Sequence, residues 1–400
     1  MMHPPMSTDP SLRTVPPSEA SRPPLEIPFN RYTPMGRELD YIRETMGIGQ
    51  IAGGQTFSQR SQRWLEENLG VARALLTTSC THALEMAALL LGLKADDEVI
   101  VPAYTFVSTA SAFALRGVRI VFADVRPDTF NLDETVLPAL VTGRTRAIVP
   151  VHYAGVACEM TPMLELAKGR GIAVVEDNAH GLFGKYRGRW LGTLGDLAAQ
   201  SFHETKNITC GEGGALFVND AGYRERAEII RDKGTNRARF FRGQVDKYTW
   251  VDLGGSYVMS DVLAAFLYGQ LEVWRTIQEK RRAIWERYRQ ELAVWAAASG
   301  VRLPVVPAHC DPAWHMFHLF MPDLAVRTAF IEHLRARGIL AVFHYQPLHL
   351  SDYGRRYGFK EGACPVAESA GDRLVRLPFF TGLTSDQQSK VIAAVLSFRS

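Results

Sequence analysis

The chain has 400 residues, of which 46% are apolar and 22% charged, and this composition excludes a mainly disordered protein because it can bury a sizeable core. Its 45 basic and 42 acidic residues leave a net charge of only +3, which disfavours nucleic acid or an anionic membrane as partner, since both demand a basic surface. The longest uncharged apolar run lies between Glu85 and Lys94 and is far shorter than the ~18 residues that a membrane span needs. We therefore expect a globular protein of two or three domains that binds neither nucleic acid nor membrane.

The N-terminal segment and the cysteines indicate the cellular compartment of the protein. Residues 1–28 are rich in proline and contain no apolar stretch of the kind a secretory signal requires, so they predict a flexible tail. The five cysteines are widely spaced and form no C-x-x-C pair. This spacing predicts no disulfide framework and favours a reducing cytoplasm.

Short runs rich in Val and Ile alternate with helical patterns between residues 70 and 232, which is typical of βαβ units and a mostly parallel sheet. The predicted strands are Ala74–Thr78, Glu98–Pro102, Arg119–Val125, Ala147–Tyr153, Ala173–Asp177, Ala198–His203 and Gly214–Asn219. The predicted helices are Ala83–Leu93, Ser108–Leu115, Thr135–Leu140, Thr161–Lys168 and Tyr223–Arg231. The pattern predicts an α/β domain with a seven-stranded sheet.

After Ser260 the pattern changes to long helices, followed by shorter alternating elements. The expected helices are Asp261–Arg281 and Arg282–Ala298, and the later elements are Trp314–Phe320, Ala325–Arg337, Leu340–Phe343, Leu374–Leu377 and Asp386–Ser397. This part predicts a second, smaller α+β domain.

Polar residues follow three of the predicted strands, at the sheet edge where α/β proteins bind ligands. The run Thr78–His82 lies between a strand and a helix, where free N–H groups favour a phosphate, although such a run often only caps the helix. Asp177 ends a buried strand and needs either a cationic partner or a capping role. Lys206 ends another strand, and a lysine in a pocket can become a nucleophile, although most lysines are solvated surface charges. Together these groups are what pyridoxal phosphate (PLP) requires: a phosphate cradle, a pyridinium partner and an imine lysine.

Signals for other cofactors are weak. Residues Gly47–Ala52 match G-x-G-x-x-A, but no predicted strand precedes them, so they are interpreted as a loop. His315 and His318 lie an odd number of positions apart on a predicted strand and would face opposite sides, so packing or hydrogen bonding is favoured over metal binding. The sequence predicts no metal site.

From about Phe29 to the C-terminus, the sequence resembles the PLP-dependent nucleotide-sugar aminotransferases of fold type I, the aspartate aminotransferase-like class. The resemblance is carried by residues 102–107 (PAYTFV), 150–155 (PVHYAG), 176–180 (EDNAH), 201–207 (SFHETKN) and 344–349 (HYQPLH). Within that family, Leu75–Thr81, Arg242–Trp250 and Ala341–Tyr345 are most similar to the dTDP-4-amino-4,6-dideoxygalactose transaminases. The resemblance implies a large PLP-binding α/β domain over residues 29–259, and linking helices with a small C-terminal α+β domain over residues 260–400.

The resemblance also implies roles for individual residues. Lys206 would hold PLP as an imine and move a proton between the substrate carbon and the cofactor, and Asp177 would pair with the pyridinium nitrogen. Phe106 would stack on the cofactor ring. Ser201 and the backbone N–H groups of Thr81 and His82 would hold the phosphate. His180 stands where many members carry a Gln near the phenolic oxygen, and Lys206 is retained where dehydratases of the family carry His.

The implied reaction moves an amino group from L-glutamate to C4 of a dTDP-4-keto-6-deoxyhexose in a cytoplasmic homodimer, with galacto or gluco product configuration left open. His344, Tyr345 and His349 are candidate sugar-nucleotide contacts, and Lys247 and Arg242 are candidate diphosphate contacts. A transaminase acting at C3 of the sugar and a non-catalytic PLP-fold regulator remain as alternatives. A nucleotide-sugar oxidoreductase is disfavoured because no strand-linked glycine fingerprint is present.

Overall fold

The structure is a computed structural model that describes residues 24–399. Most of the predicted proline-rich tail therefore lies outside the described residues. The last part of that predicted tail is packed: Ile27 is buried, and its backbone pairs with the loop around Gly338 and Ile339.

A seven-stranded sheet forms the centre of the large domain, in the order β1-β9-β8-β5-β4-β2-β3. Every neighbouring pair is parallel except the two pairs that involve β9, which confirms the predicted mostly parallel seven-stranded sheet. Its strands are β1 (Arg73–Thr77), β2 (Glu98–Pro102), β3 (Arg119–Ala123), β4 (Thr145–Ile148), β5 (Ala173–Asp177), β8 (Leu197–Ser201) and β9 (Gly214–Val218).

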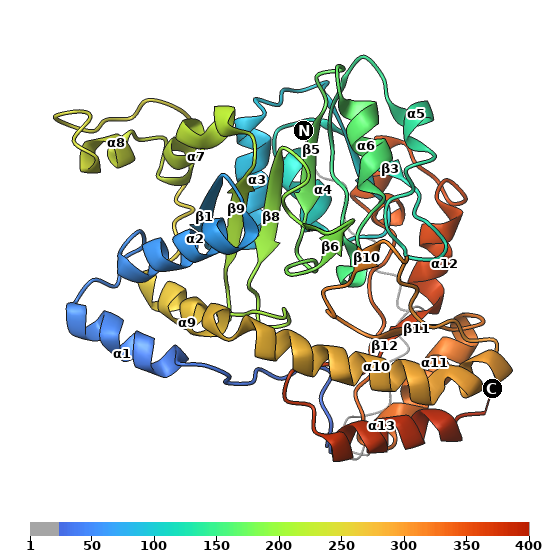
Figure 1. Cartoon of the computed structure of the whole chain (residues 1–400). Helices are drawn as coiled ribbons and strands as arrows, with labels where there is room; N and C mark the ends of the chain where they lie inside the picture. The colour runs from blue at the N-terminus through green and yellow to red at the C-terminus, as the bar shows by residue number, and fades with distance from the viewer. Residues whose placement is uncertain (1–23, 400) are drawn as a thin grey trace, which may run out of the picture.

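Helices cover both faces of this sheet because successive side chains of each strand point to opposite sides. Leu75 and Leu216 belong to one buried cluster, whereas their neighbours Leu76 and Phe217 belong to another. The helices of this part are α1 (Glu38–Ile48), α2 (Thr56–Leu69), α3 (Cys80–Leu90), α4 (Ser108–Ala114), α5 (Leu137–Leu140), α6 (Met160–Ala167), α7 (Arg224–Arg231) and α8 (Arg237–Phe241). Figure 1 shows α3 lying against β8 and β9.

Two long helices connect the large sheet to the smaller domain, but they divide at a different residue from the one predicted. Helix α9 (Asp261–Glu272) ends at Val273, where φ is −109° and ψ is 20°, and α10 (Trp274–Ala298) begins directly afterwards. The predicted division between Arg281 and Arg282 is wrong, because α10 continues through both residues. The true break contains neither Gly nor Pro, so nothing local in the sequence marks it.

The smaller domain is built on a second core around α10. It contains α11 (Leu324–Arg335), α13 (Ser385–Ser397) and the two-stranded sheet β11 (His318–Phe320) with β12 (Leu374–Arg376). Helix α12 (Pro365–Arg373) instead buries Ala367 and Ala370 in the core of the central sheet. The predicted strand Trp314–Phe320 is therefore shorter than expected, and Leu340–Phe343 contributes only a bridge between Val342 and Arg376. A further small sheet joins β6 (Lys185–Tyr186), β7 (Arg189–Trp190) and β10 (Cys310–Asp311), and the 3-10 turns are η3 (Tyr153–Gly155), η4 (Ala221–Tyr223), η5 (Leu348–Leu350) and η6 (Gly354–Tyr357).

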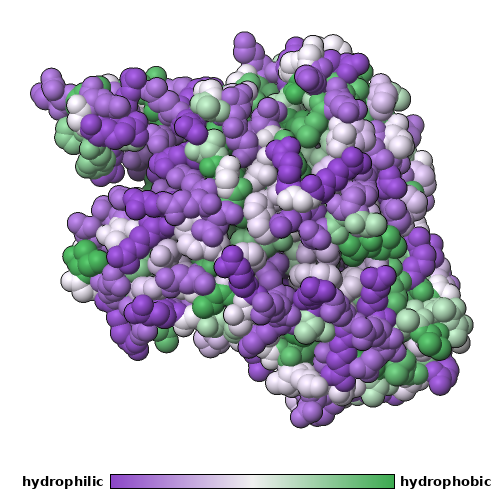
Figure 2. Space-filling model, viewed as in Figure 1, coloured by the Kyte–Doolittle hydropathy of each residue, from purple (hydrophilic) through white to green (hydrophobic). Residues whose placement is uncertain are grey.

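Residues 232–255, which we call the arm, stand off from the body of the molecule. In Figure 1 the arm carries α8 at the upper left, and Figure 2 shows a notch between it and the body below. Its large apolar side chains are exposed, with Phe241 69% and Trp250 75% accessible. Among residues 24–399, no helix is both long and apolar enough to cross a bilayer.

Candidate active site

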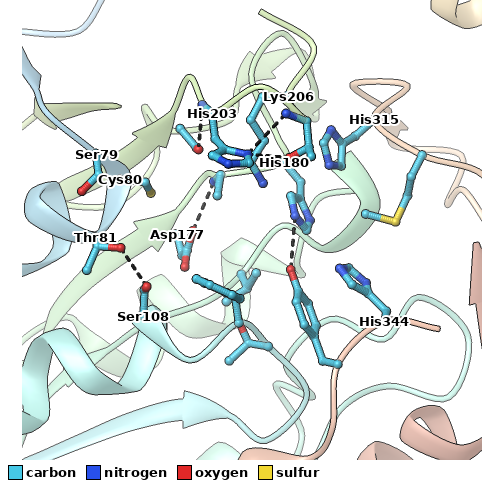
Figure 3. A pocket seen from close by; sticks show the side chains of 18 of the residues that line it. Ser79, Cys80, Thr81, Ser108, Asp177, His180, His203, Lys206, His315 and His344 are labelled. Atoms are coloured by element: carbon cyan, nitrogen blue, oxygen red, sulfur yellow. Dashed lines mark hydrogen bonds between the residues drawn. The ribbon is translucent and has the colours of Figure 1, made fainter. Parts of the chain in front are cut away.

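A cavity of about 590 Å³ lies where the predicted strand-end residues meet. Asp177 ends β5, Ser201 ends β8 and Lys206 follows β8 by five residues. In Figure 3, Ser79, Cys80, Thr81 and Ser108 lie on one side of Asp177, and three histidines lie on the other, with Lys206 above. The carboxyl ends of parallel strands and the N-terminus of α3 thus converge on one space, as expected for this kind of sheet.

The N-terminus of α3 forms the polar end of the cavity. Ser79 caps the helix by accepting a hydrogen bond from the His82 N–H at 3.1 Å, so the capping and phosphate-binding interpretations of this run are compatible. Cys80 and Thr81 line the cavity, and first-turn N–H groups have no acceptor within their own helix. The Thr81 hydroxyl bonds that of Ser108 at 2.8 Å. An N-terminal helix turn of this kind favours an anion.

Gly214 allows this turn to approach the sheet closely. A Cβ at that position would lie 2.4 Å from the backbone N of Cys80 and 2.6 Å from the carbonyl oxygen of Ser79. Only a residue without a side chain fits there.

Asp177 is buried, and its two oxygens are held in place. Oδ2 accepts a hydrogen bond from the Thr109 hydroxyl at 2.7 Å, and Oδ1 accepts one from the Ala179 N–H at 3.2 Å. Burial raises the pKa of Asp177, while the bonds from Thr109 and Ala179 and the charge of Lys206 oppose the rise. A carboxylate in such surroundings is stabilised by a cationic ligand atom.

Lys206 lies partly buried at the opposite wall of the cavity. Burial lowers the pKa of its amine from 10.5 to about 8, although the nearby Cys80 and Asp177 act in the opposite direction. Arg376 adds to the lowering. An amine with such a pKa is a far better nucleophile at neutral pH than an ordinary lysine.

Four imidazoles line the cavity, and three of them, those of His180, His315 and His344, form one stacked group. The rings of His180 and His315 stack with centroids 4.3 Å apart, and His344 lies 6.0 Å from His180. Burial lowers the pKa of all three well below its usual value, helped by the neighbouring cations. These rings are therefore neutral near pH 7 and act as hydrogen-bonding groups rather than charges.

Hydrogen bonds fix two of these rings. His315 Nδ1 donates to the Asn207 side-chain oxygen at 2.9 Å, and His344 Nδ1 bonds the Tyr153 hydroxyl at 2.8 Å. His180 Nε2 faces the Tyr345 hydroxyl at 3.4 Å, whereas its Nδ1 is buried with no protein partner. The predicted packed or hydrogen-bonded state of His315 is thus observed, on an irregular segment rather than a strand. Among residues 24–399, no three His, Cys, Asp or Glu side chains are grouped in a way that could hold a metal ion.

Most of the predicted site residues lie on this cavity, but not all. The structure places Thr81, Phe106, Asp177, His180, Ser201, Lys206, His344 and Tyr345 along its wall. Phe106 is 55% exposed, and its ring centroid lies 6.2 Å from that of Tyr345. The side chain of His82 does not line the cavity; it bonds Thr78 and packs against Tyr257, and its N–H is already used by Ser79. The phosphate contact of the His82 N–H therefore stays a prediction, since this N–H already has an acceptor in Ser79.

Three other predicted substrate contacts lie away from the cavity. His349 is fully buried and bonds Glu368 at 2.8 Å, so its proposed contact with a sugar nucleotide is wrong. Arg242 and Lys247 lie on the arm, where Arg242 pairs with Glu228 at 2.7 Å. Neither residue reaches the cavity of its own chain.

Sequence reasoning missed several residues that do line the cavity, among them Asn30, Ser108, Met316 and Arg376. Ser108 was detectable as the first residue of a predicted helix after the PAYTFV segment. The others come from the N-terminal segment and the small domain, and only the tertiary fold brings them to the sheet edge.

Comparison with known proteins identifies the family. Residues 35–396 match the model of the DegT/DnrJ/EryC1/StrS aminotransferase family. The chain belongs to this family. It is 31% identical to the spore coat polysaccharide biosynthesis protein SpsC of Bacillus subtilis over 90% of this chain and 93% of SpsC.

Solved structures of the family share its fold. The aminotransferase TlmJ from Streptoalloteichus hindustanus superposes with a TM-score of 0.83 at 31% identity, covering 94% of this chain and 98% of that one. A putative sugar aminotransferase from Streptococcus pneumoniae in its PMP form gives a TM-score of 0.85 at 25% identity, covering 93% and 98%. The chain is thus an aminotransferase of the PLP-dependent sugar aminotransferase family, with the fold-type-I architecture predicted from its sequence.

The cavity fits the cofactor of this family. The first turn of α3 offers N–H groups to a phosphate, Asp177 offers a carboxylate to a cationic ring nitrogen, and Lys206 offers an amine for covalent attachment. Nδ1 of buried His180 has no partner within the protein and is therefore a polar atom that a ligand in the cavity can satisfy. Each functional part of PLP therefore has a matching group on the wall.

Proposed function

We propose that this aminotransferase moves an amino group from L-glutamate to C4 of a dTDP-4-keto-6-deoxyhexose, giving a 4-amino-4,6-dideoxy sugar nucleotide and 2-oxoglutarate. The observation that carries the proposal is the placement of Lys206 and Asp177 in one cavity with the N-terminal end of α3. The resemblance of Leu75–Thr81, Arg242–Trp250 and Ala341–Tyr345 to the 4-aminogalactose transaminases supports the choice of C4. SpsC, by its name, serves polysaccharide synthesis, which is compatible with an amino sugar as product.

In this mechanism the residues of the chain bind, orient and move protons. Bound PLP supplies an aldehyde for covalent attachment and a ring that takes up an electron pair. Lys206 Nζ moves the proton on and off the substrate carbon, because it is the amine on that side of the cavity and burial lowers its pKa to about 8. The carboxylate of Asp177 would stabilise a positive charge on the ring nitrogen of the cofactor. Phe106 covers the ring, Ser201 and the N-terminus of α3 hold the phosphate, and His180 donates near the phenolic oxygen.

We assign the sugar to the end of the cavity formed by His344 and Tyr345. Their rings stack at a centroid separation of 3.5 Å, and Tyr153 holds His344 in place. Neutral imidazole and phenol groups donate and accept hydrogen bonds, as a hydroxylated ring requires.

We further propose that the working enzyme is a homodimer in which the arm of one copy completes the cavity of the other. The exposed apolar residues Phe241, Tyr248 and Trp250 of the arm support this, since such patches mark contact surfaces. Lys247 and Arg242 are then placed to meet the diphosphate of the partner's substrate. This arrangement would explain why neither residue lines the cavity of its own chain.

The function is tested in two half-reactions with purified protein. The PLP-loaded enzyme is mixed with L-glutamate, and the absorbance spectrum and the release of 2-oxoglutarate are followed. The resulting amino form is then offered dTDP sugars with a ketone at C4 or at C3, and products are identified by mass spectrometry and NMR. Lys206→Ala is the control that removes the amine and leaves the rest of the wall.

We expect release of 2-oxoglutarate by the wild type alone and transfer to the 4-keto sugar. Transfer only to the 3-keto sugar would mean that the enzyme catalyses the alternative reaction, transamination at C3. A cofactor spectrum that glutamate and other amino donors leave unchanged would refute the aminotransferase proposal and favour a non-catalytic regulator.

The dimer is tested separately by light scattering and by mixing variants. A mixture of Lys206→Ala and Lys247→Ala chains forms dimers in which one cavity has both lysines intact. Recovery of the KM for the sugar nucleotide in the mixture would support the crossing arm, and a fully active monomer would refute it.

A further inference from the structure

His315 belongs to an irregular segment, residues 313–315, that is held against the cavity by its backbone. The Ala313 N–H donates a hydrogen bond to the carbonyl oxygen of Gly155 at 2.8 Å. The buried guanidinium of Arg281 donates to the carbonyl oxygens of the next two residues, at 3.0 Å and 2.6 Å. Because the backbone is fixed on both sides, the direction of the His315 ring depends on the hydrogen bonds of the ring itself.

Asn207, the chain neighbour of Lys206, has an amide whose orientation follows from its partners. Its Nδ2 faces the carbonyl oxygen of Ala313, which can only accept, and also donates to Gln278 Oε1 at 3.0 Å. Gln278 Nε2 donates to the same Ala313 carbonyl at 3.1 Å, so one backbone oxygen orients both amides. The oxygen of the Asn207 amide therefore points toward His315.

This orientation determines which nitrogen of His315 carries the proton. Asn207 Oδ1 lies 2.9 Å from Nδ1 of His315 and can only accept a hydrogen bond, so Nδ1 carries a hydrogen. Burial lowers the pKa of His315 well below its usual value, with the charges of His180 and Lys206 adding to the effect, so the ring is neutral near pH 7. A neutral imidazole with Nδ1–H has an unprotonated Nε2, which is a hydrogen-bond acceptor.

The Nε2 atom of His315 has no hydrogen-bond partner within residues 24–399. The side chain lines the main cavity together with Lys206, and both also border a small space beside it with Asn207 and His180. In Figure 3 the His315 ring lies next to that of His180, on the same side of the cavity as Lys206. The structure thus presents a fixed acceptor without a donor near the reactive amine.

Two kinds of substrate group could donate to this acceptor: the amine that is transferred and the hydroxyls of a sugar. The transferred nitrogen takes part in both half-reactions, because it leaves the amino donor and enters the sugar, and it reacts beside Lys206. Sugar hydroxyls are present in only one half-reaction. An acceptor that served them alone would stay without a donor whenever the amino acid is bound, which is unfavourable for a buried polar atom.

We propose that Asn207 is a positioning residue that holds His315 as the Nδ1–H tautomer, so that Nε2 accepts a hydrogen bond from the transferred amine and orients its lone pair. This inference rests on the proposed function, because it requires an amine as the transferred group. In the opposite tautomer an N–H of His315 would face the N–H groups of the amine. Loss of the arrangement should slow the reaction of the bound donor more than it weakens binding, since this bond orients the nitrogen and does not hold the carboxylates of the donor.

The tautomer is measured directly, in protein without cofactor and without turnover. Histidine labelled with 15N in the ring is incorporated, and the shifts and couplings of Nδ1 and Nε2 show which atom carries the proton. The variant His315→Phe assigns the signals, because only those of His315 disappear. We expect a protonated Nδ1 and an unprotonated Nε2 in the wild type, and loss of this fixed tautomer in Asn207→Leu.

The same variants are compared in the half-reaction with the amino donor, by rapid mixing over a range of donor concentrations. Asn219→Leu is the matched control: the Asn219 amide also donates to two carbonyl oxygens, those of Gly192 and Gly195, but lies outside the cavity. His315→Phe keeps a ring that can stack on His180 and should lower the maximal rate by roughly 100-fold, and Asn207→Leu by about 10-fold. The donor concentration at half-maximal rate should stay within about threefold of wild type in both, and the control should match wild type.

Melting temperatures show whether each variant is folded, and if Asn207→Leu is not, the wild-type signals and His315→Phe still decide. A wild-type His315 protonated at Nε2, or at both nitrogens, would overturn the proposal. An unchanged rate in His315→Phe would overturn its role at the amine. Losses of affinity as large as those of rate, with a lowered melting temperature, would mean a structural role only.

Failure of the proposed function has a different signature. A wild type that reacts with no amino donor refutes the aminotransferase function and this inference together. A wild type that reacts with amino donors but not with the 4-keto sugar refutes only the proposed sugar substrate. In that case a slowed first half-reaction in His315→Phe and Asn207→Leu would still support the inference.

Discussion

The lowered pKa of Lys206 predicts how readily the protein without cofactor takes up PLP. An amine with a pKa of about 8 is roughly one quarter neutral at pH 7.5, whereas one at 10.5 is only about 0.1% neutral. The folded protein thus offers about 240 times more of the reactive form than an ordinary lysine does. Burial is the main cause of this difference, so it requires the folded cavity.

The measurement is the rate of PLP uptake by protein stripped of cofactor, followed by absorbance between pH 6.5 and 9.5. Nα-acetyl-lysine amide is the reference, because PLP itself titrates and dividing the two rates removes that contribution. We expect the ratio to be level at low pH and to fall above a midpoint near 8, because the cavity lysine is then largely neutral while the reference amine continues to lose its proton. A ratio that is flat, or a midpoint at the ordinary lysine value, would refute the view that the cavity lowers the pKa.

Two neighbours of Lys206 should move this midpoint in opposite directions. Asp177→Asn removes a negative charge that raises the pKa of Lys206, so its midpoint should fall. Arg376→Gln removes a positive charge that lowers it, so its midpoint should rise. Arg373→Gln, outside the cavity, should leave the midpoint where it is. Shifts of the same sign in the first two variants would mean that local unfolding, not charge, governs the rate.

Three further changes test the framework around the site. Glu176→Gln should cost about 2–4 kcal/mol in chemical denaturation, because the buried carboxylate accepts bonds from His152 and from the N–H groups of Gly192, Leu194 and Gly195. Burial alone would raise the pKa of Glu176, but the hydrogen bond and charge of His152 and the backbone hydrogen bonds outweigh burial, so the pKa is lowered. The stability that the ionised carboxylate contributes is therefore present above pH 4.5 and lost as the pH falls below that value. The Gln variant lacks this contribution, so its acid transition should be shallower. Gly214→Ala should weaken PLP binding and cost about 1–3 kcal/mol by pushing the backbone of Cys80 away, whereas Gly47→Ala, which meets nothing within 4 Å, should be neutral or slightly stabilising by thermal melting. Asp177→Asn should lower the rate of the glutamate half-reaction by at least about 100-fold, as rapid mixing would measure, with Thr109→Val as a milder variant that keeps the carboxylate.

The central sheet could be predicted because its signal is local. Continuous runs of Val, Ile and Ala mark the buried strands β2, β5 and β8, and the polar residues that follow them must lie at one edge. For the same reason Asp177, Ser201 and Lys206 could be placed together from sequence alone. The placement of these three residues depends on which strands they follow and not on the details of side-chain packing.

The errors concern contacts between distant segments. His349 does not follow a predicted strand, so the strand-end rule says nothing about its position. Its burial against Glu368 depends on how α12 packs on the large domain. Arg376 looks like one more surface cation until β12 pairs with β11 and brings it to the cavity. His82 is a further case, because the Ser79 hydroxyl accepts a hydrogen bond from the His82 N–H, and only the capping geometry shows that this N–H already has an acceptor.

The charges of the cavity explain why three histidines can gather beside a lysine. Lys206 and Arg376 are cations, Asp177 and Glu212 are the carboxylates of the wall, and a cofactor phosphate and a donor carboxylate would each bring negative charge. If His180, His315 and His344 were also charged, the cations would repel one another across a few ångströms. Burial instead holds the rings neutral, so they contribute hydrogen-bonding atoms without charge. The cavity can then accept an anionic amino acid in one half-reaction and a neutral sugar ring in the other without rearranging its wall.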